Sequence, residues 1–451
     1  MQERSRPTVA VVGAGIAGLG AAWELARRRF AVAVFEREAR PGGRARSESV
    51  EGFTLEAAGP VLSTGDRRLL SWIDEVGLRD ELLPLRPVVT IHCRGDRVAS
   101  IDPRGLFGVG RIPGVRPLQA LRLVRLPRLV ARYGGRIDPE APERAADLDD
   151  RSLGDFGRLY FGRSVLAHWM GPFVTGTSLG RADDLSRVLF LRRYRSHARE
   201  RPGLLRSALG ELAEAAAAKL RVKYAAAALR VERAGDGGLS LAVQASGAER
   251  VFEPAAVVVA TSAPEAARLT APALVAAERD GLAEVRYQPA LSLALGLRRP
   301  FFPHPQYVQL PHSEGSPLEA VLLEPGVHGG RVPDGRGLAL LRATGAWSEA
   351  YFDAPEETVC KELLDAFARI RPGAESAVLF SKLHRVERAH PRFGVGRYRQ
   401  IARFERVQRE LRREGRRLYF AGDYLMDPTL EGALASGQRA AAAVAEDLRI
   451  A

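Results

Sequence analysis

The feature that most constrains this fold is a glycine-rich turn between a short strand and a helix near the start of the chain. Residues 8–12 are predicted to form a buried strand, residues 13–18 have the spacing G-x-G-x-x-G, and a helical pattern runs over residues 16–29. A second apolar stretch, residues 31–35, ends in Glu36. This order of strand, turn, helix, strand and acid predicts a βαβ unit in a parallel sheet.

Each residue of the turn has a physical task in binding a dinucleotide. Gly13 allows the tight turn, Gly15 lets the backbone approach a pyrophosphate, and Gly18 lets the helix pack closely on the strands. The helix N-terminus offers free N–H groups to phosphates. Glu36 lies 18 residues after Gly18, where a carboxylate accepts hydrogen bonds from ribose hydroxyls. The predicted dinucleotide contacts here are Gly13, Ala14, Gly15, Ile16, Ala17, Gly18 and Glu36.

The residues after the acid indicate which dinucleotide is bound. Residues 40–44 read Arg-Pro-Gly-Gly-Arg, and paired glycines followed by an arginine let a loop wrap the far side of a large dinucleotide. With this continuation, residues 9–44 resemble the flavoprotein superfamily of amine oxidases, protoporphyrinogen oxidases and phytoene-type desaturases. The resemblance implies FAD and adds Arg37, Gly42, Gly43 and Arg44 to the expected contacts. No cysteine lies near residues 390–398, so we expect the FAD to be bound without a cysteinyl link.

The far end of the chain resembles the C-terminal flavin motif of the same superfamily. An apolar strand is expected at 418–421, followed by Gly422 and Asp423, and an alanine-rich helix at 433–448. The resemblance implies that the aspartate meets the ribitol or pyrophosphate and that the start of the helix lies by the flavin ring. The implied contacts are Gly422, Asp423, Leu430, Glu431, Gly432 and Ala433. Two motifs about 400 residues apart thus agree on one cofactor.

Three further stretches resemble parts of the same superfamily. Residues 52–62 resemble the segment under the flavin ring of protoporphyrinogen oxidases, which implies contacts from Ala58, Gly59, Pro60 and Val61. Residues 152–186 resemble the helical substrate-domain segment of those enzymes, and residues 390–398 resemble a segment that re-enters near the flavin.

The resemblance covers nearly the whole chain and implies an α/β fold, α+β overall. A Rossmann-like FAD-binding domain would be interleaved with a substrate domain of mixed sheet and helices. We expect the FAD domain to comprise residues 1–86, 203–265 and 380–451, and the substrate domain to comprise residues 87–202 and 266–379. Besides the strands named above, the pattern predicts a helix at 204–220 and strands at 222–232, 239–244, 255–260, 288–297 and 338–344.

The implied activity is an FAD-dependent oxidase or dehydrogenase. A hydrophobic organic substrate would transfer hydride to flavin N5, and O2 or another acceptor would reoxidise the flavin. Amine oxidases commonly place a lysine near N5, about ten residues before a Pro-Phe-aromatic sequence; here that sequence is at 300–302 and the matching position is Ser292. The aromatic residue that usually precedes their last motif is Thr429 here, so a typical amine oxidase is disfavoured.

Carbon dehydrogenation remains, in one of two forms. Residues 152–186 favour a protoporphyrinogen oxidase, whereas the Pro-Thr-Leu-Glu-Gly-Ala ending favours a desaturase. The alternatives kept open are a protoporphyrinogen or coproporphyrinogen oxidase proper, a flavin amine oxidase, and a non-redox isomerase that uses FAD as a scaffold.

No catalytic base stands out in the sequence. Candidates for the substrate cavity are Trp169, Phe173, His390 and Arg397, each with packing or surface solvation as the alternative. A histidyl link from His390 to the flavin is considered, but a structural or substrate-facing role is favoured. The two cysteines, at positions 93 and 360, build neither a disulfide framework nor a cysteine metal site, and no metal is expected.

The net charge of +13 has an unusual source, because only four of the 67 basic residues are lysines. Scattered arginines and an aromatic content of 7% argue against a nucleic-acid partner. Residues 118–133 alternate leucine and valine with arginine, which suits either contact with an anionic membrane or, as favoured, a surface helix packed on the core. With no visible signal peptide or membrane-spanning run, we expect a cytoplasmic protein, with peripheral membrane contact as the alternative.

Overall fold

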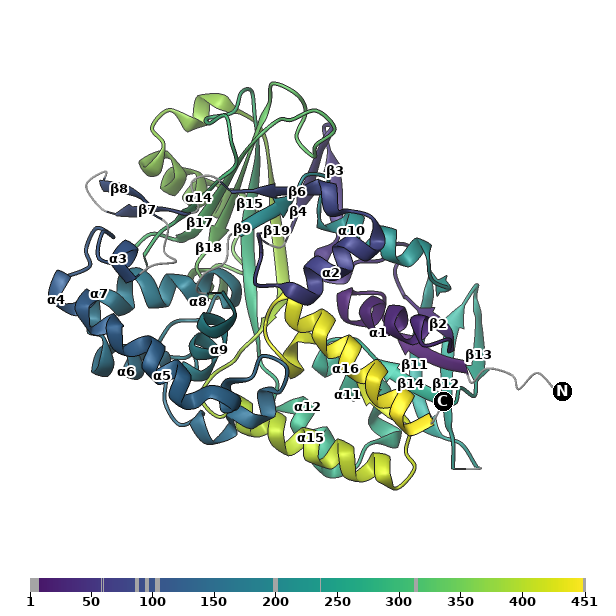
Figure 1. The fold of residues 1–451 in the computed structure, drawn as a ribbon. Helices are drawn as coiled ribbons and strands as arrows, with labels where there is room; N and C mark the ends of the chain where they lie inside the picture. The colour runs from purple at the N-terminus through teal and green to yellow at the C-terminus, as the bar shows by residue number, and fades with distance from the viewer. Residues whose placement is uncertain are drawn as a thin grey trace.

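The computed structural model describes residues 8–57, 59, 61–85, 89–93, 97–101, 106–197, 202–235, 237–311 and 315–448. Two of the residues expected beside the flavin, Ala58 and Pro60, lie outside this described part. The described strands form two larger sheets, of five and seven strands, and three small ones (Figure 1).

The five-stranded sheet is parallel and confirms the Rossmann-like prediction. Its order is β10-β2-β1-β14-β20, with bounds Val222–Lys223, Ala31–Phe35, Thr8–Val12, Ala256–Val259 and Leu418–Phe420. The central strand β1 is buried on both faces: Val9 and Val11 face one apolar cluster, whereas Ala10 and Val12 face another. A strand covered on both sides needs a continuous apolar run, which explains its sequence, TVAVV.

Helices from the two ends of the chain cover one face of this sheet. Helix α1 (Ile16–Arg27) lies beside α16 (Leu430–Leu448), drawn purple and yellow in Figure 1. The helices approach closely because Gly437 faces the carbonyl of Ala17, where a Cβ would clash. The N-terminal and C-terminal motifs are thereby brought together.

The seven-stranded sheet is the mixed sheet expected for the substrate side. Its order is β19-β15-β18-β17-β16-β7-β8, with bounds Val378–Pro391, Tyr287–Leu297, Gly337–Ala343, Leu318–Pro325, Gln306–Gln309, Val89–Cys93 and Arg97–Ile101. The pair β16–β7 is parallel and the other pairs are antiparallel. Helix α14 (Glu356–Ile370) packs on one face.

The other face of this sheet meets a helical region, which lies at the left of Figure 1. Its helices are α3 (Leu106–Val109), α4 (Pro117–Ala120), α5 (Arg125–Tyr133), α6 (Leu153–Tyr160), α7 (Arg163–Val165), α8 (Gly171–Ser178) and α9 (Arg187–His197).

The remaining elements complete the layers around the sheets. The helices are α2 (Arg67–Val76), α10 (Leu209–Ala218), α11 (Ala263–Thr270), α12 (Ala276–Ala283), α13 (Gly345–Ala350) and α15 (Arg397–Arg413). The small sheets are β3-β4 (Ser47–Val50, Phe53–Glu56), β5-β9-β6 (Leu62–Ser63, Pro202–Leu205, Leu82–Pro84) and β11-β12-β13 (Ala226–Arg233, Leu239–Ala245, Ala248–Phe252). The helix expected from residue 204 begins only at Leu209, because residues 202–205 pair with β5 and β6 instead.

The expected division into two domains remains a proposal. One difference bears on it: β19, residues 378–391, is hydrogen-bonded to β15 in the seven-stranded sheet. A division by sheets would therefore leave residues 380–391 on the substrate side, whereas the resemblance placed them in the FAD domain.

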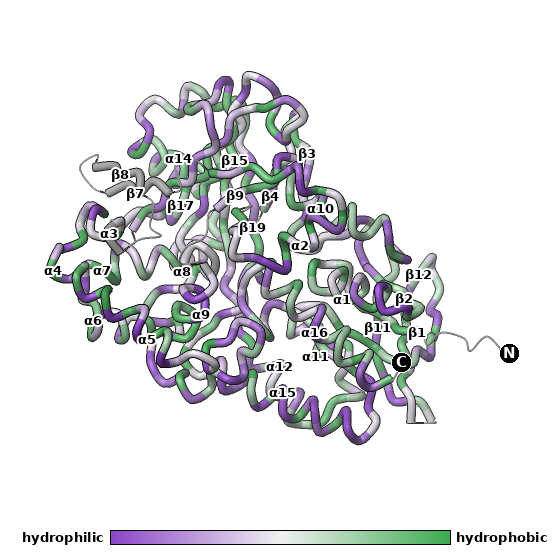
Figure 2. The backbone as a smooth tube through the Cα atoms, viewed as in Figure 1, coloured by the Kyte–Doolittle hydropathy of each residue, from purple (hydrophilic) through white to green (hydrophobic). Residues whose placement is uncertain are grey.

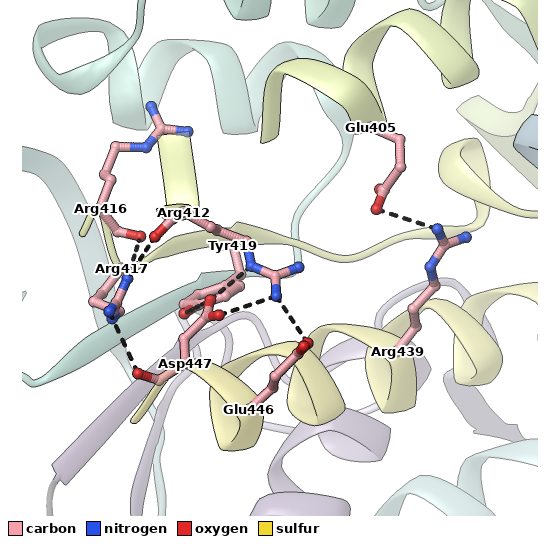
Figure 3. A network of polar contacts seen from close by, with 8 residues as sticks. All are labelled: Glu405, Arg412, Arg416, Arg417, Tyr419, Arg439, Glu446 and Asp447. Atoms are coloured by element: carbon pink, nitrogen blue, oxygen red, sulfur yellow. Dashed lines mark hydrogen bonds and ion pairs between the residues drawn. The ribbon is translucent and has the colours of Figure 1, made fainter. Parts of the chain in front are cut away.

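Many of the arginines form ion pairs near the surface. Figure 3 shows one such group, in which Nε of Arg412 lies 2.6 Å from Oδ2 of Asp447 and the hydroxyl of Tyr419 donates to the same oxygen over 2.7 Å. These contacts join α15, β20 and α16. The tube along α15 is predominantly hydrophilic in Figure 2, as expected for a surface helix.

Candidate functional site

A cavity of about 1340 Å³ lies between the two larger sheets and is lined by both. Four of the parallel strands, β1, β2, β14 and β20, are followed within two residues by a residue of its wall: Gly13, Glu36, Ala260 and Gly422. This is the carboxyl edge at which open α/β sheets bind ligands. The expected cofactor residues that line it are Gly13, Gly15, Ile16, Ala17, Glu36, Arg37, Gly42, Gly43, Arg44, Gly59, Val61, Gly422, Asp423, Leu430 and Ala433.

The glycine turn has the geometry that its spacing predicts. Gly13 adopts a φ of 100°, which favours glycine, and its N–H donates to the carbonyl of Phe35 over 2.8 Å. A Cβ on Gly18 would clash with the carbonyl of Gly13, so this glycine is needed for packing. By contrast, no described atom lies within 4 Å of where a Cβ on Gly15 would be. The helix N-terminus therefore opens onto free space in the cavity.

The carboxylate of Glu36 is fixed by backbone donors at the end of β2. Oε2 accepts from the N–H of Ala14 over 2.7 Å, and Oε1 accepts from the N–H of Glu38 over 3.0 Å. Each carboxylate oxygen retains a further lone pair, because an ionised carboxylate accepts about four hydrogen bonds. Glu36 is thus oriented for a hydroxyl-bearing ligand. Residues 227–229 and 260–262 also line this part of the cavity, and sequence reasoning missed them.

An ion pair joins the two motifs that lie far apart in sequence. Nη1 and Nη2 of Arg44 each lie 2.8 Å from a carboxylate oxygen of Asp423, and Nη1 also donates to the carbonyl of Ala389 over 2.6 Å. Bidentate pairs of this kind fix orientation as well as charge. Arg44 therefore positions Asp423 at the cavity wall.

Four of the expected cofactor residues do not line the cavity, and the structure gives each another contact. The N–H of Ala14 holds Glu36, and Gly18 packs against the turn. Glu431 accepts from the N–H groups of Arg68 and Leu69 at the start of α2, over 3.1 and 2.8 Å; burial raises the pKa of Glu431 to about 7. Gly432 is needed because a Cβ there would clash with the carbonyl of Asp427.

The cavity continues into what we call the inner chamber, which lies between the helical region and the seven-stranded sheet. The chamber is lined by His168, Trp169, Phe173, Gly176, Arg193, Tyr307, Gln309 and Arg342. Ring contacts link three of these residues: the rings of Trp169 and Phe173 have centroids 6.0 Å apart, and the guanidinium of Arg193 lies 5.6 Å from the centre of the Phe173 ring.

Trp169 and Phe173 were expected to face the substrate and they line this chamber, whereas Arg342, Arg193, Tyr307 and Gln309 were missed. One signal was available, since Arg342 is the single charged residue in the apolar strand GLALLRA. The sequence does not show which face of the sheet borders a cavity, so it could not show that Arg342 lines one.

His390 lies on β19 and lines the cavity, as expected. Burial, together with the charges of Arg342 and Arg44, lowers the pKa of His390 to about 3, although a hydrogen bond to the backbone of Pro428 opposes this shift. The imidazole is therefore neutral near pH 7.

Arg397, the fourth residue expected at the substrate, lies elsewhere in the structure. This residue does not line the cavity; it is buried at the start of α15, and its Nη2 donates to the carbonyl of Tyr424 over 2.7 Å. Burial lowers the pKa of Arg397 to about 10. Its position is structural because the helix turns this side chain toward the loop after β20.

The residues present suit FAD. Gly15 leaves room for a pyrophosphate at a helix N-terminus, Glu36 offers acceptors for a ribose, and the long cavity leads on to an aromatic chamber. Within the described part of the chain, no group of three His, Cys, Asp or Glu side chains is placed to hold a metal ion.

Comparisons with known proteins identify the family of this chain. A protein of Mycobacterium tuberculosis named as a flavin-containing monoamine oxidase is 31% identical over 245 residues, which is 51% of this chain and 52% of that protein. Protoporphyrinogen oxidase 2 of Arabidopsis thaliana is 28% identical over 186 residues, 40% of this chain and 34% of that protein. The matched part thus spans between a third and about half of the length of these relatives.

A solved double mutant of putrescine oxidase has the same fold, with a TM-score of 0.77 at 19% identity over 98% of this chain and 99% of that one. The family model for flavin containing amine oxidoreductases matches residues 16–445. The chain therefore belongs to the flavin containing amine oxidoreductase family, and its cofactor is FAD.

Proposed function

We propose that this protein is an FAD-dependent oxidase or dehydrogenase that removes hydride from a hydrophobic organic substrate. The observation that carries the proposal is one continuous cavity, which joins the open helix N-terminus at Gly15 to the aromatic inner chamber. The aromatic walls of the inner chamber suit an apolar substrate held beside a flavin.

The side chains of the site divide into two groups by task. Gly15 and the start of α1 would hold the pyrophosphate, Glu36 would hold a ribose, and the Arg44–Asp423 pair would fix the middle of the cofactor. Bound FAD supplies the two-electron acceptor for the hydride. Trp169 and Phe173 would orient the substrate and exclude water.

The residue at the position where amine oxidases have a lysine is Ser292, which supports dehydrogenation of a carbon framework over oxidation of an amine. Ser292 lies on β15 and donates its hydroxyl to the carbonyl of Ala57 over 3.1 Å, so it is already engaged. Thr429 lines the cavity where amine oxidases usually have an aromatic wall. Porphyrinogen oxidation is the second candidate, because the Arabidopsis relative carries that name and the inner chamber is aromatic.

An anaerobic screen tests the proposal. The purified protein should be yellow, and a polyene or a porphyrinogen should bleach the flavin in the absence of oxygen, whereas amines and amino acids should not. Bleaching by amines alone would refute carbon dehydrogenation. A flavin that can be photoreduced but that no substrate bleaches, together with isomerised product, would support the non-redox alternative instead.

The basic segment 118–133 raises the question of contact with a membrane surface. Its Leu123 and Leu126 are buried, whereas Leu118 and Leu121 are 80% and 67% exposed. We favour a surface helix packed on the core, and co-sedimentation with anionic vesicles that is lost in high salt would overturn this choice. In the described part of the chain, no helix is long and apolar enough to cross a bilayer.

A further inference from the structure

We propose that the inner chamber binds the carboxylate of an apolar, flat organic acid, with Arg342 as its principal partner. This inference rests on the proposed function and names its substrate class. It follows from the position of one buried guanidinium, from the charges around it and from the shape of the walls.

Arg342 lies on β18 with only 9% of its surface exposed, and it lines the cavity. Its Nη1 donates to the carbonyl of Gly176 over 2.7 Å. Within the described residues no carboxylate forms an ion pair with it, so the rest of its donor fork is available to a ligand. A buried cation without a counter-ion is costly, and an arriving anion would offset that cost.

Arg342 also reaches the segment expected under the flavin ring. A Cβ on Gly59 would lie 2.8 Å from its Nη1 and 3.1 Å from its Cζ, so the guanidinium packs directly on this glycine. The neighbouring strand places Ser292 opposite Arg342 in register, and Ser292 is bonded to Ala57 of the same segment. A carboxylate held by Arg342 would therefore anchor the substrate at the junction of the inner chamber and the cofactor cavity.

The charges around the inner chamber favour an anion over a cation. Arg193 contributes a second guanidinium over the Phe173 ring, and none of the described residues that line the chamber is acidic. Glu319 of β17 influences Tyr307 electrostatically but does not line the cavity. Two positive groups in an apolar pocket would repel an ammonium ion and attract a carboxylate, which an arginine fork binds in bidentate fashion.

The walls of the chamber select the body of the acid. Trp169 and Phe173 present rings tilted by 36° to each other, and Tyr307 lines the chamber from the sheet side. Aromatic walls favour flat, apolar ligands by burial and by ring contacts. Gln309, which donates to the carbonyl of Pro172 over 3.3 Å, adds a neutral polar group beside them.

The test compares three probes of one shape on the oxidised holoenzyme: 2-naphthoate, neutral 2-naphthamide and cationic 2-naphthylmethylamine. Binding is measured by isothermal titration calorimetry and by perturbation of the flavin absorbance. The wild type should bind naphthoate at least about tenfold more tightly than the amide, and the amine most weakly, because charged hydrogen bonds contribute more than neutral ones. Arg342→Gln should weaken naphthoate binding about 10- to 100-fold and leave the amide nearly unchanged.

Control variants distinguish the loss of a carboxylate-binding group from a general loss of folding. Arg336→Gln changes an exposed arginine just before β18 and should leave all three affinities unchanged. Arg342→Lys keeps the charge without the fork and should give an intermediate naphthoate affinity; it also serves if Arg342→Gln loses its flavin. Equal affinities for naphthoate and naphthamide in the wild type, or naphthoate binding that neither Arg342 variant weakens, would overturn the inference.

The two proposals fail in distinguishable ways. A holoenzyme that prefers naphthoate but is bleached by no reduced substrate would refute the oxidase and keep the carboxylate site. A holoenzyme that is bleached by a neutral polyene and shows no preference for naphthoate would do the opposite.

Discussion

Replacing Gly15 by alanine should separate cofactor binding from folding. Gly15 has a φ of −76° and a ψ of 177°, which alanine adopts without strain, and nothing described lies within 4 Å of the added Cβ. Alanine lowers the backbone entropy of the unfolded chain, which stabilises the folded protein by about 0.4–1 kcal/mol. Alanine is a poorer N-cap than glycine by a similar amount, so the two effects nearly cancel.

The effect on FAD should be large, because the new methyl group occupies the space through which a pyrophosphate approaches the helix N-terminus. Displacing the phosphate would weaken one or two charge-assisted hydrogen bonds, each of about 1.5–3 kcal/mol. We expect FAD affinity to fall roughly 10- to 100-fold, since 1.4 kcal/mol corresponds to about tenfold. The melting temperature of the apoprotein should stay close to that of the wild type.

The assay is a titration of apoprotein with FAD, followed by flavin fluorescence, beside thermal unfolding of the apoprotein by circular dichroism. Gly135→Ala is the matched control. A Cβ on Gly135 would also meet open space, but Gly135 does not line the cavity. Gly18→Ala is the opposite control, since its Cβ clashes with the carbonyl of Gly13 and should lower stability by about 1–3 kcal/mol. Wild-type FAD affinity in Gly15→Ala would refute the assignment of the phosphate site.

Three further outcomes are expected. Asp423→Ala removes the bidentate partner of Arg44 and should lower the ratio of flavin to protein absorbance in the purified protein; an unchanged ratio would contradict a role in holding FAD. The pKa of His390 is about 3 in the fold against 6.5 when unfolded, so the unfolded state takes up the proton first as pH falls. The wild type should lose roughly 2 kcal/mol more unfolding free energy than His390→Gln between pH 7 and pH 5, as measured by urea titration, and equal losses would refute a neutral, buried imidazole. Gly437→Ala should push α16 from the carbonyl of Ala17 and lower the unfolding free energy by about 1–3 kcal/mol, which Gly135→Ala should not do.

The sequence pattern predicted the Rossmann-like sheet and its turn correctly because that chemistry is local. The tasks of Gly13 and Gly18 depend on residues within one βαβ unit, and the pattern of strand, turn and helix is visible without tertiary contacts. The same holds for the mixed second sheet, whose strands β15 and β18 are long apolar runs. The short strand β9 was missed, because its partners come from distant segments.

Which side chains of a helix point toward the cavity was decided only by tertiary packing. Glu431 and Ala433 belong to one motif, yet α16 turns the glutamate toward the start of α2 and the alanine toward the cavity. Arg397 was expected at the substrate and is buried beneath the loop after β20. A motif states that residues are near a cofactor, but the rotation of a helix sets which of them reach it.

The sequence by itself determined the class of cofactor and the fold that holds it. Tertiary structure decided that Arg44 pairs with Asp423, which lies near the other end of the chain. It also decided that Arg342 is a buried cation that lines the cavity. The physical reason is that glycine turns act through backbone conformation, which a few neighbouring residues specify. The character of a charge depends on its burial and its partners, which only the assembled sheets and helices supply.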